Sequence, residues 1–130
     1  MALPGAGSSV FLVEDDVLIR MMVVEMLEEL GHRIAAETGD LDHAERLART
    51  VEYDVAILDV NLKGRSISSV ADLISESGRP LIFVTGYGVA GLPAGYQDRP
   101  VLQKPFKLEE LGAMIEFVVG SKSEPPVSPP

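Results

Sequence analysis

The sequence has 130 residues, of which 46% are hydrophobic and 24% are charged, and this composition is typical of a single soluble globular domain. The formal net charge of −9 excludes a general attraction to nucleic acid phosphates or anionic lipid, but it is compatible with Mg2+ or a basic protein surface. The absence of cysteine excludes disulfides, thiolate metal sites and cysteine nucleophiles.

The two ends of the sequence differ from its middle. Residues 1–8 are rich in small residues, which predicts a flexible N-terminus, and residues 122–130 contain four prolines, which predicts a disordered tail. The folded body is then residues 9–121. No apolar run reaches the roughly 20 residues of a membrane span, and the N-terminus lacks the basic start of a signal peptide. We therefore expect a cytoplasmic protein.

Short apolar runs predict the strands. Continuous runs of this length are typical of strands that are buried on both faces, as in a parallel sheet. In chain order the predicted strands are Val10–Val13, Arg33–Glu37, Val55–Leu58, Leu81–Val84 and the weaker Val101–Leu102.

Helical patterns lie between these runs. Asp16 is expected to cap a helix that ends at Leu30 and Gly31, with methionines on its core-facing side, and Asp40 is expected to cap a second helix. The buried stripe of the first helix is predicted to be Leu18, Met22, Met26 and Leu30. Two further helices are predicted over residues 66–77 and 107–119, the last one ended by Gly120. The alternation of strands and helices predicts a doubly wound α/β fold with right-handed crossovers.

The segment from Gly86 to Gly95 breaks this alternation. Its four glycines and one proline argue against a regular helix and favour a flexible loop or one distorted turn. We expect residues 86–98 to be mobile in the resting protein and to become ordered on activation.

Polar residues follow four of the predicted strands. Glu14, Asp15 and Asp16 follow the first strand, and Asp59 and Asn61 follow the third. Thr85 and Lys104 follow the last two strands. Because ligands of such folds bind at the carboxyl ends of the strands, these side chains are expected to share one site.

Clustered carboxylates repel one another unless a cation lies among them, and oxygen ligands favour Mg2+. A site of this kind suits phosphoryl transfer, which depends mainly on positioning and charge stabilisation. Asp59 is the candidate nucleophile, which would form an aspartyl phosphate. Lys104 and the Thr85 hydroxyl would contact phosphate oxygens.

Each residue also has an ordinary interpretation when it is taken alone. For the acids after the first strand, taken alone, helix capping is about as good an explanation as a functional role. Capping alone explains Asp16. Asp59 fits a turn, Thr85 a strand end and Lys104 a solvated surface position. The functional interpretation rests on all four groups falling at the ends of separate strands.

These motifs resemble the receiver domain of bacterial response regulators, over about residues 9–121. They are residues 10–16 (Val-Phe-Leu-Val-Glu-Asp-Asp), 57–62 (Ile-Leu-Asp-Val-Asn-Leu), 83–86 (Phe-Val-Thr-Gly) and 103–106 (Gln-Lys-Pro-Phe). The resemblance implies the CheY-like or flavodoxin-like arrangement, a five-stranded parallel sheet of order 2-1-3-4-5.

The resemblance also implies a role for each residue. Asp59 would be the phosphoacceptor and Asp15 the direct Mg2+ ligand, with Glu14 as the second acid. The Asn61 backbone carbonyl would complete the metal site. Thr85 would be the switch hydroxyl, Lys104 would contact the phosphate, and Pro105 would follow a cis peptide bond.

The sequence departs from the family at its switch region. Most receivers carry an aromatic residue three positions before the lysine, and here that position is Val101. Residues 83–88 instead resemble the subfamily with a Phe-Ala-Thr-Gly-Gly/Tyr signature (FATGUY type), so that Tyr87 is a second switch candidate. The short stretch between Thr85 and Lys104 predicts a short or irregular fourth helix.

We therefore expect a single-domain response regulator rather than a turnover enzyme. Its phosphodonor would be a histidine kinase, with the HWE type as a candidate class, or a phosphotransfer protein. It would signal through an unknown downstream protein or act as a phosphate sink. Only about ten residues follow the last predicted helix, so no DNA-binding output is expected. A homodimer is a further option, since receivers often pair.

Two alternatives belong to other classes. A small phosphohydrolase of the haloacid dehalogenase type also uses a strand-end Asp with Thr and Lys, but it usually has a second acid two residues after the nucleophile, where this chain has Asn61. Multiple turnover of a phosphomonoester would favour that enzyme. A docking module that works without phosphorylation would be favoured if Asp59→Asn kept signalling in the cell.

Overall fold

The computed structural model describes residues 7–86 and 91–123. Five strands form a parallel sheet in the order β2-β1-β3-β6-β7. In chain order this is 2-1-3-4-5, so the predicted doubly wound α/β fold is confirmed. The strands are β1 (Ser9–Val13), β2 (Arg33–Thr38), β3 (Val55–Asp59), β6 (Leu81–Thr85) and β7 (Val101–Gln103).

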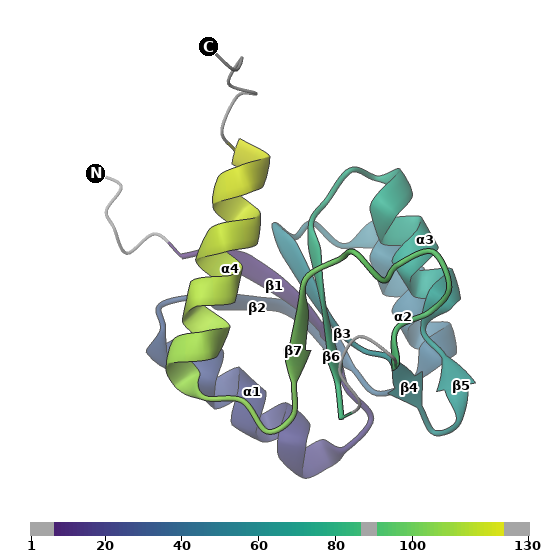
Figure 1. The fold of residues 1–130 in the computed structure, drawn as a ribbon, viewed down its shortest axis with the longest axis horizontal. Coiled ribbons are helices and arrows are strands. Elements are labelled where there is room, and N and C mark those ends of the chain that lie inside the picture. Colours follow the sequence, from purple (N-terminus) through teal and green to yellow (C-terminus); the bar gives the residue numbers. More distant parts are fainter. Residues whose placement is uncertain (1–6, 87–90, 124–130) are drawn as a thin grey trace.

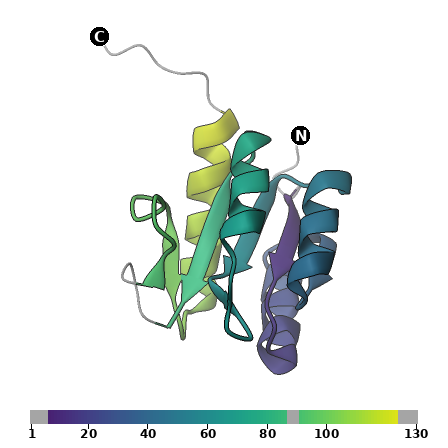
Figure 2. The same ribbon diagram turned by 90° about the vertical axis from the view of Figure 1, so that its right-hand side faces the viewer.

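Helices cover both faces of the sheet (Figures 1 and 2). α1 (Val17–Glu29) and α4 (Leu108–Ser123) lie on one face, and α2 (Leu41–Thr50) and α3 (Ser68–Glu76) lie on the other. Successive strand residues point to opposite faces, and each face has its own buried cluster. Val10 and Leu12 pack with α1 and α4, whereas Phe11 and Val13 pack with α2 and α3. This two-sided burial explains why the strands read as continuous apolar runs.

Both predicted aspartate caps are present. The Asp16 carboxylate accepts a hydrogen bond from the Ile19 N–H at 3.1 Å, and the Asp40 carboxylate accepts one from the His43 N–H at 2.8 Å. The last helix does not end at Gly120 as predicted. It continues to Ser123, because a glycine lowers helix stability by only about 1 kcal/mol and does not by itself stop a helix.

The predicted core stripe of α1 is wrong in its first half, whereas Met26 and Leu30 do pack against the buried cluster. Leu18 is 74% exposed and Met22 is 57% exposed, whereas Val23 and Leu27 are the buried residues of this helix. Val17 and Met21 are also exposed, so the first half of α1 carries an apolar surface patch. The helix is apolar on most sides, and periodicity therefore could not identify its buried face. No helix in the described part of the chain is long and apolar enough to cross a membrane.

A small hairpin that was not predicted follows β3. It pairs β4 (Asn61–Leu62) with β5 (Arg65–Ser66), so the third helix begins at Ser68 rather than at Ser66. Its two-residue loop has positive φ at Lys63 (51°) and at Gly64 (85°). This turn geometry suits the twist of a tight hairpin, and a glycine at the second position favours it.

The connection from β6 to β7 contains no α-helix within residues 91–100, as the glycine-rich sequence predicted. Leu92 and Tyr96 are nevertheless buried there, in the cluster that α2 and α3 share. The Tyr96 hydroxyl donates to the Asp72 carboxylate at 2.6 Å, and its ring packs edge-on against Phe83 at 5.4 Å. These contacts anchor the described part of the connection to α3 and β6.

Candidate functional site

The carboxyl end of the sheet collects the polar residues that the sequence placed after its strands. Glu14 follows β1, Asp59 is the last residue of β3 and Thr85 is the last residue of β6, and all three are buried. Lys104 follows β7, and its backbone N–H donates to the Thr85 carbonyl at 2.9 Å. Parallel strands end at the same edge, so four distant chain segments meet in one place.

Lys104 joins the two buried acids. Its Nζ lies 3.1 Å from Glu14 Oε1 and 3.5 Å from Asp59 Oδ2. Burial would lower the pKa of Lys104, but the hydrogen bond to Glu14 and the attraction of both carboxylates outweigh it, so this pKa is raised. The ammonium group is therefore a fixed positive charge beside Asp59.

Burial dominates the protonation of the acids. It raises the pKa of Glu14 to about 7, against the opposing hydrogen bond from the Asp16 N–H and the attraction of Lys104. Burial also raises the pKa of Asp59, although Lys104 and the hydrogen bond from the Asn61 N–H favour the charged form. The positive charge of Lys104 alone therefore does not offset the burial of the Glu14 and Asp59 carboxylates.

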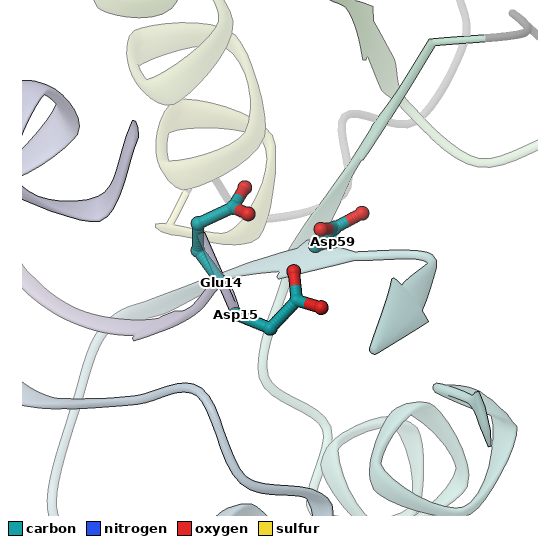
Figure 3. Close-up of side chains that lie close together, drawn as sticks. All are labelled: Glu14, Asp15 and Asp59. Carbon is teal, nitrogen blue, oxygen red and sulfur yellow. The ribbon is translucent and has the colours of Figure 1, made fainter. Parts of the chain in front are cut away.

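Glu14, Asp15 and Asp59 form one cluster of carboxylates (Figure 3). One oxygen from each lies within 4.8 Å of the others. With the three acids ionised and Lys104 protonated, two negative charges remain, which is the charge that a divalent cation would balance. The cluster offers only oxygen ligands, and this donor set fits Mg2+.

The β4–β5 hairpin contacts the cluster directly. The backbone N–H of Lys63 donates to Asp15 Oδ2 at 2.8 Å, and the Asn61 side chain accepts from the Gly64 N–H at 2.7 Å. The sequence interpretation missed this contact. The available signal was Gly64, because a two-residue hairpin loop of this type needs positive φ and glycine adopts it readily.

A cavity of about 740 Å3 opens over these groups. Its lining includes Asp15, Asp59, Thr85 and Lys104 together with the hairpin residues 63–66. The Asp59 carboxylate is thus buried in the fold while it borders solvent space that admits a phosphoryl group.

The remaining predicted positions have different outcomes. The peptide bond between Lys104 and Pro105 is cis, as expected. Val101 is partly buried beside the cluster that contains Tyr96. Among the described residues of the β6–β7 connection, the aromatic ring is that of Tyr96. Tyr87 lies outside the described residues, and its proposed switch role is untested.

Comparisons with known proteins agree with this geometry. The family model for the response regulator receiver domain matches residues 10–116. The transcriptional regulatory protein PdtaR of Mycobacterium tuberculosis is 33% identical over 114 residues, which cover 85% of this chain and 56% of that protein. The chain thus spans about half the length of the curated relatives it matches.

Two solved structures are similar over nearly their whole length. SdrG from Sphingomonas melonis is 31% identical with a TM-score of 0.78, over 88% of this chain and 98% of that chain. The receiver domain of the sensor histidine kinase PA1611 from Pseudomonas aeruginosa is 26% identical with a TM-score of 0.73, over 88% and 99%. That structure has a magnesium ion coordinated in its active site cleft.

Proposed function

Because this chain belongs to the response regulator receiver family, we propose that Asp59 accepts a phosphoryl group from a phosphohistidine in a Mg2+-dependent reaction. One observation carries the proposal. The buried Asp59 carboxylate lies beside Lys104 and clusters with two further acids, and it borders an open cavity. The chain would act as a receiver in a phosphorelay. Because the phosphohistidine donor would be phosphorylated from ATP, we propose that the transfer takes place in the cytoplasm.

In the proposed step, an Asp59 carboxylate oxygen attacks phosphorus. The new O–P bond forms as the P–N bond of the donor breaks, and the electron pair leaves on the imidazole nitrogen. Lys104 holds a positive charge beside the carboxylate, and the Thr85 hydroxyl would donate to a phosphoryl oxygen. Glu14, Asp15, Asp59 and the Asn61 carbonyl would hold Mg2+, which supplies charge neutralisation for the incoming oxygens.

A receiver of this kind is favoured over a turnover phosphatase by the residue at position 61. An acid there could activate water against the aspartyl phosphate, but Asn61 is an amide whose oxygen is bonded to the Gly64 N–H. Receiver domains normally act as signalling modules. We therefore expect one phosphoryl group per chain and slow loss of that group.

The test is labelling with acetyl phosphate, read by intact mass and by mapping the modified residue. We expect a mass increase of one phosphoryl group that requires Mg2+ and that Asp59→Asn abolishes. Asp54→Asn, an acid at the other end of β3, should label normally. An unmodified wild-type chain, with Mg2+ present and the fold confirmed by circular dichroism, would reject the proposal.

The exposed patch on α1, formed by Val17, Leu18, Met21 and Met22, favours a protein as the donor. α1 starts directly after the acidic pair, so a donor that reaches Asp59 also covers the start of this helix. Contiguous exposed apolar side chains commonly mark a protein interface. We propose a histidine kinase or a phosphotransfer protein that places apolar side chains on this patch.

Comparing a protein donor with acetyl phosphate distinguishes docking on this patch from phosphoryl transfer to Asp59. Phosphotransfer profiling of the host's histidine kinases would identify the protein donor. The double variant Leu18→Gln with Met22→Gln should slow transfer from this donor by about tenfold. Labelling by acetyl phosphate should not change. Phe117→Gln is the matched control, since Phe117 is 65% exposed on α4. Equal rates from the protein donor for both variants would remove α1 from the interface.

A further inference from the structure

Arg20 in the first turns of α1 makes two contacts with its guanidinium group. Nη1 donates to the backbone carbonyl of Glu14 at 2.7 Å, and Nε lies 3.3 Å from Glu37 Oε1. The Arg20 side chain is only 21% exposed. A planar guanidinium with several fixed donors suits this bridging of two oxygens, whereas a lysine ammonium has one nitrogen for both.

The contact with Glu14 falls on the segment that carries the acidic cluster. The Glu14 N–H donates to the Thr38 carbonyl at 3.0 Å, so both backbone groups of Glu14 are bonded to neighbours. The Glu14 carbonyl belongs to the peptide that leads into Asp15. Holding this carbonyl therefore fixes the direction in which the Asp15 side chain leaves the end of β1.

Gly39 provides the space for this arrangement. A Cβ atom at position 39 would lie 2.6 Å from Arg20 Nη1, 3.0 Å from the Asp15 Cα and 3.0 Å from the Glu14 carbonyl oxygen. The φ angle of Gly39 is not in the left-handed region, so the backbone alone does not require glycine there. The connection after β2 thus passes against the acidic segment only because it lacks a side chain.

We infer that Arg20 is a positioning residue for the acidic pair, anchored by Glu37 and given space by Gly39. It acts through the Glu14 carbonyl and touches neither the phosphoryl group nor the cation. The inference rests on the proposed Mg2+ site. Residues that orient metal ligands typically change metal affinity by about 10- to 100-fold when they are replaced.

The experiment measures Mg2+ binding to the unphosphorylated protein by calorimetry. The variants are Arg20→Gln, Arg20→Lys, Gly39→Ala and the double variant Arg20→Gln with Gly39→Ala. The control is Arg79→Gln. Arg79 is also a half-buried arginine paired with a glutamate, with its Nη2 3.6 Å from Glu52 Oε1, but it lies at the other end of the sheet.

We expect Arg20→Gln and Gly39→Ala each to weaken Mg2+ binding at least tenfold, with partial recovery in Arg20→Lys. The double variant should bind no more weakly than the worse single variant, because both changes break the same contact. Arg79→Gln should leave the affinity unchanged. In acetyl phosphate labelling, the Mg2+ concentration for half-maximal rate should rise while the rate at saturating Mg2+ is kept.

The outcomes separate this inference from the proposed function. If the wild type binds Mg2+ and Arg20→Gln binds it within about twofold, the positioning role is wrong and the metal site stands. If the wild type binds no Mg2+, the metal site itself fails. Should Arg20→Gln not fold, Glu37→Gln replaces it. This variant removes one anchor and should weaken binding about threefold, and unchanged binding would overturn the inference.

Discussion

At the amino end of the sheet, the Asp54 carboxylate accepts hydrogen bonds from the Ser9 N–H at 2.9 Å and from the Ser9 hydroxyl at 3.2 Å. This acid is exposed. Asp54 directly precedes β3. At the carboxyl end of β3, Asp59 is buried beside two further acids, and its pKa is raised. β3 therefore follows a solvated acid that supports the fold and ends in a desolvated acid whose charge opposes folding. Side chains held at such a cost are candidates for function.

Replacing Lys104 should give the largest difference between variants at the two ends of the sheet. In Lys104→Met the buried Glu14 and Asp59 lose their shared positive charge, so phosphorylation of Asp59 by acetyl phosphate should slow by roughly 100-fold or more. Arg79→Met removes a cation from the amino end and should leave the rate unchanged. Equal slowing in both variants would mean that the loss reflects general destabilisation.

The two ends should also respond to pH in opposite directions. The pKa of Glu14 is raised from 4.5 to about 7, so the folded state binds more protons than the unfolded state over this range. The free energy of unfolding should therefore fall by up to about 3 kcal/mol as the pH rises from about 4.5 to 7. At the amino end of the sheet, His32 directly precedes β2, and its Nδ1 accepts a hydrogen bond from the Ser8 N–H at 2.9 Å. Burial lowers the pKa of His32 below 6.5, and this group contributes stability that increases as the pH rises toward 6.5.

Melting temperatures without Mg2+ between pH 5 and pH 8 would resolve these contributions. Glu14→Gln should reduce the fall to the part that comes from Asp59, whose pKa is also raised, whereas His32→Gln should steepen the fall. Added Mg2+ should raise the melting temperature at pH 8 and have little effect at pH 5, where Glu14 is protonated. A wild-type melting temperature that rises steadily to pH 8 would contradict the assignment to Glu14.

Neutralising Asp59 should stabilise the protein in the absence of Mg2+. Asp59→Asn removes a buried charge but keeps an oxygen that can accept from the Asn61 N–H, so the free energy of unfolding at pH 8 should rise by about 1 kcal/mol. Urea denaturation measures this change. A loss of stability would show that the ion pair with Lys104 outweighs the cost of burial.

Neutralising Asp54 should have the smallest effect and the opposite sign. Asp54→Asn weakens two exposed hydrogen bonds to Ser9, and we expect a loss of roughly 0.5 kcal/mol in the same urea experiment. Mg2+ binding should not change. If Asp54→Asn changed the free energy of unfolding more than Asp59→Asn does, the proposed contrast between the solvated and the buried acid would be wrong.

The strands and the site residues were predictable because their signals are local. A buried parallel strand is a run of apolar residues, and the polar residue after each run falls at the same sheet edge. This placed Glu14, Asp59, Thr85 and Lys104 together. Asp16 and Asp40 were identifiable as caps because a cap depends on residues three positions apart.

Features that depend on contacts between distant segments could not be predicted. The buried face of α1 is set by its neighbours, and a helix with apolar residues on most sides gives no periodic signal for it. The fit of Gly39 against Arg20, and the bond from Lys63 to Asp15, join different connections of the fold. Tyr96 was overlooked because its partners, Asp72 and Phe83, belong to other elements.

The order of the strands also has a consequence for how the chain is made. Glu14 follows the first strand of the sheet and Lys104 follows its last strand, β7, which pairs with β6 at the sheet edge. A ribosome releases Glu14, Asp15 and Asp59 well before Lys104, so a nascent chain has the acids without their cation. The proposed phosphoryl acceptance should therefore become possible only after Lys104 has left the ribosome and β7 has paired with β6.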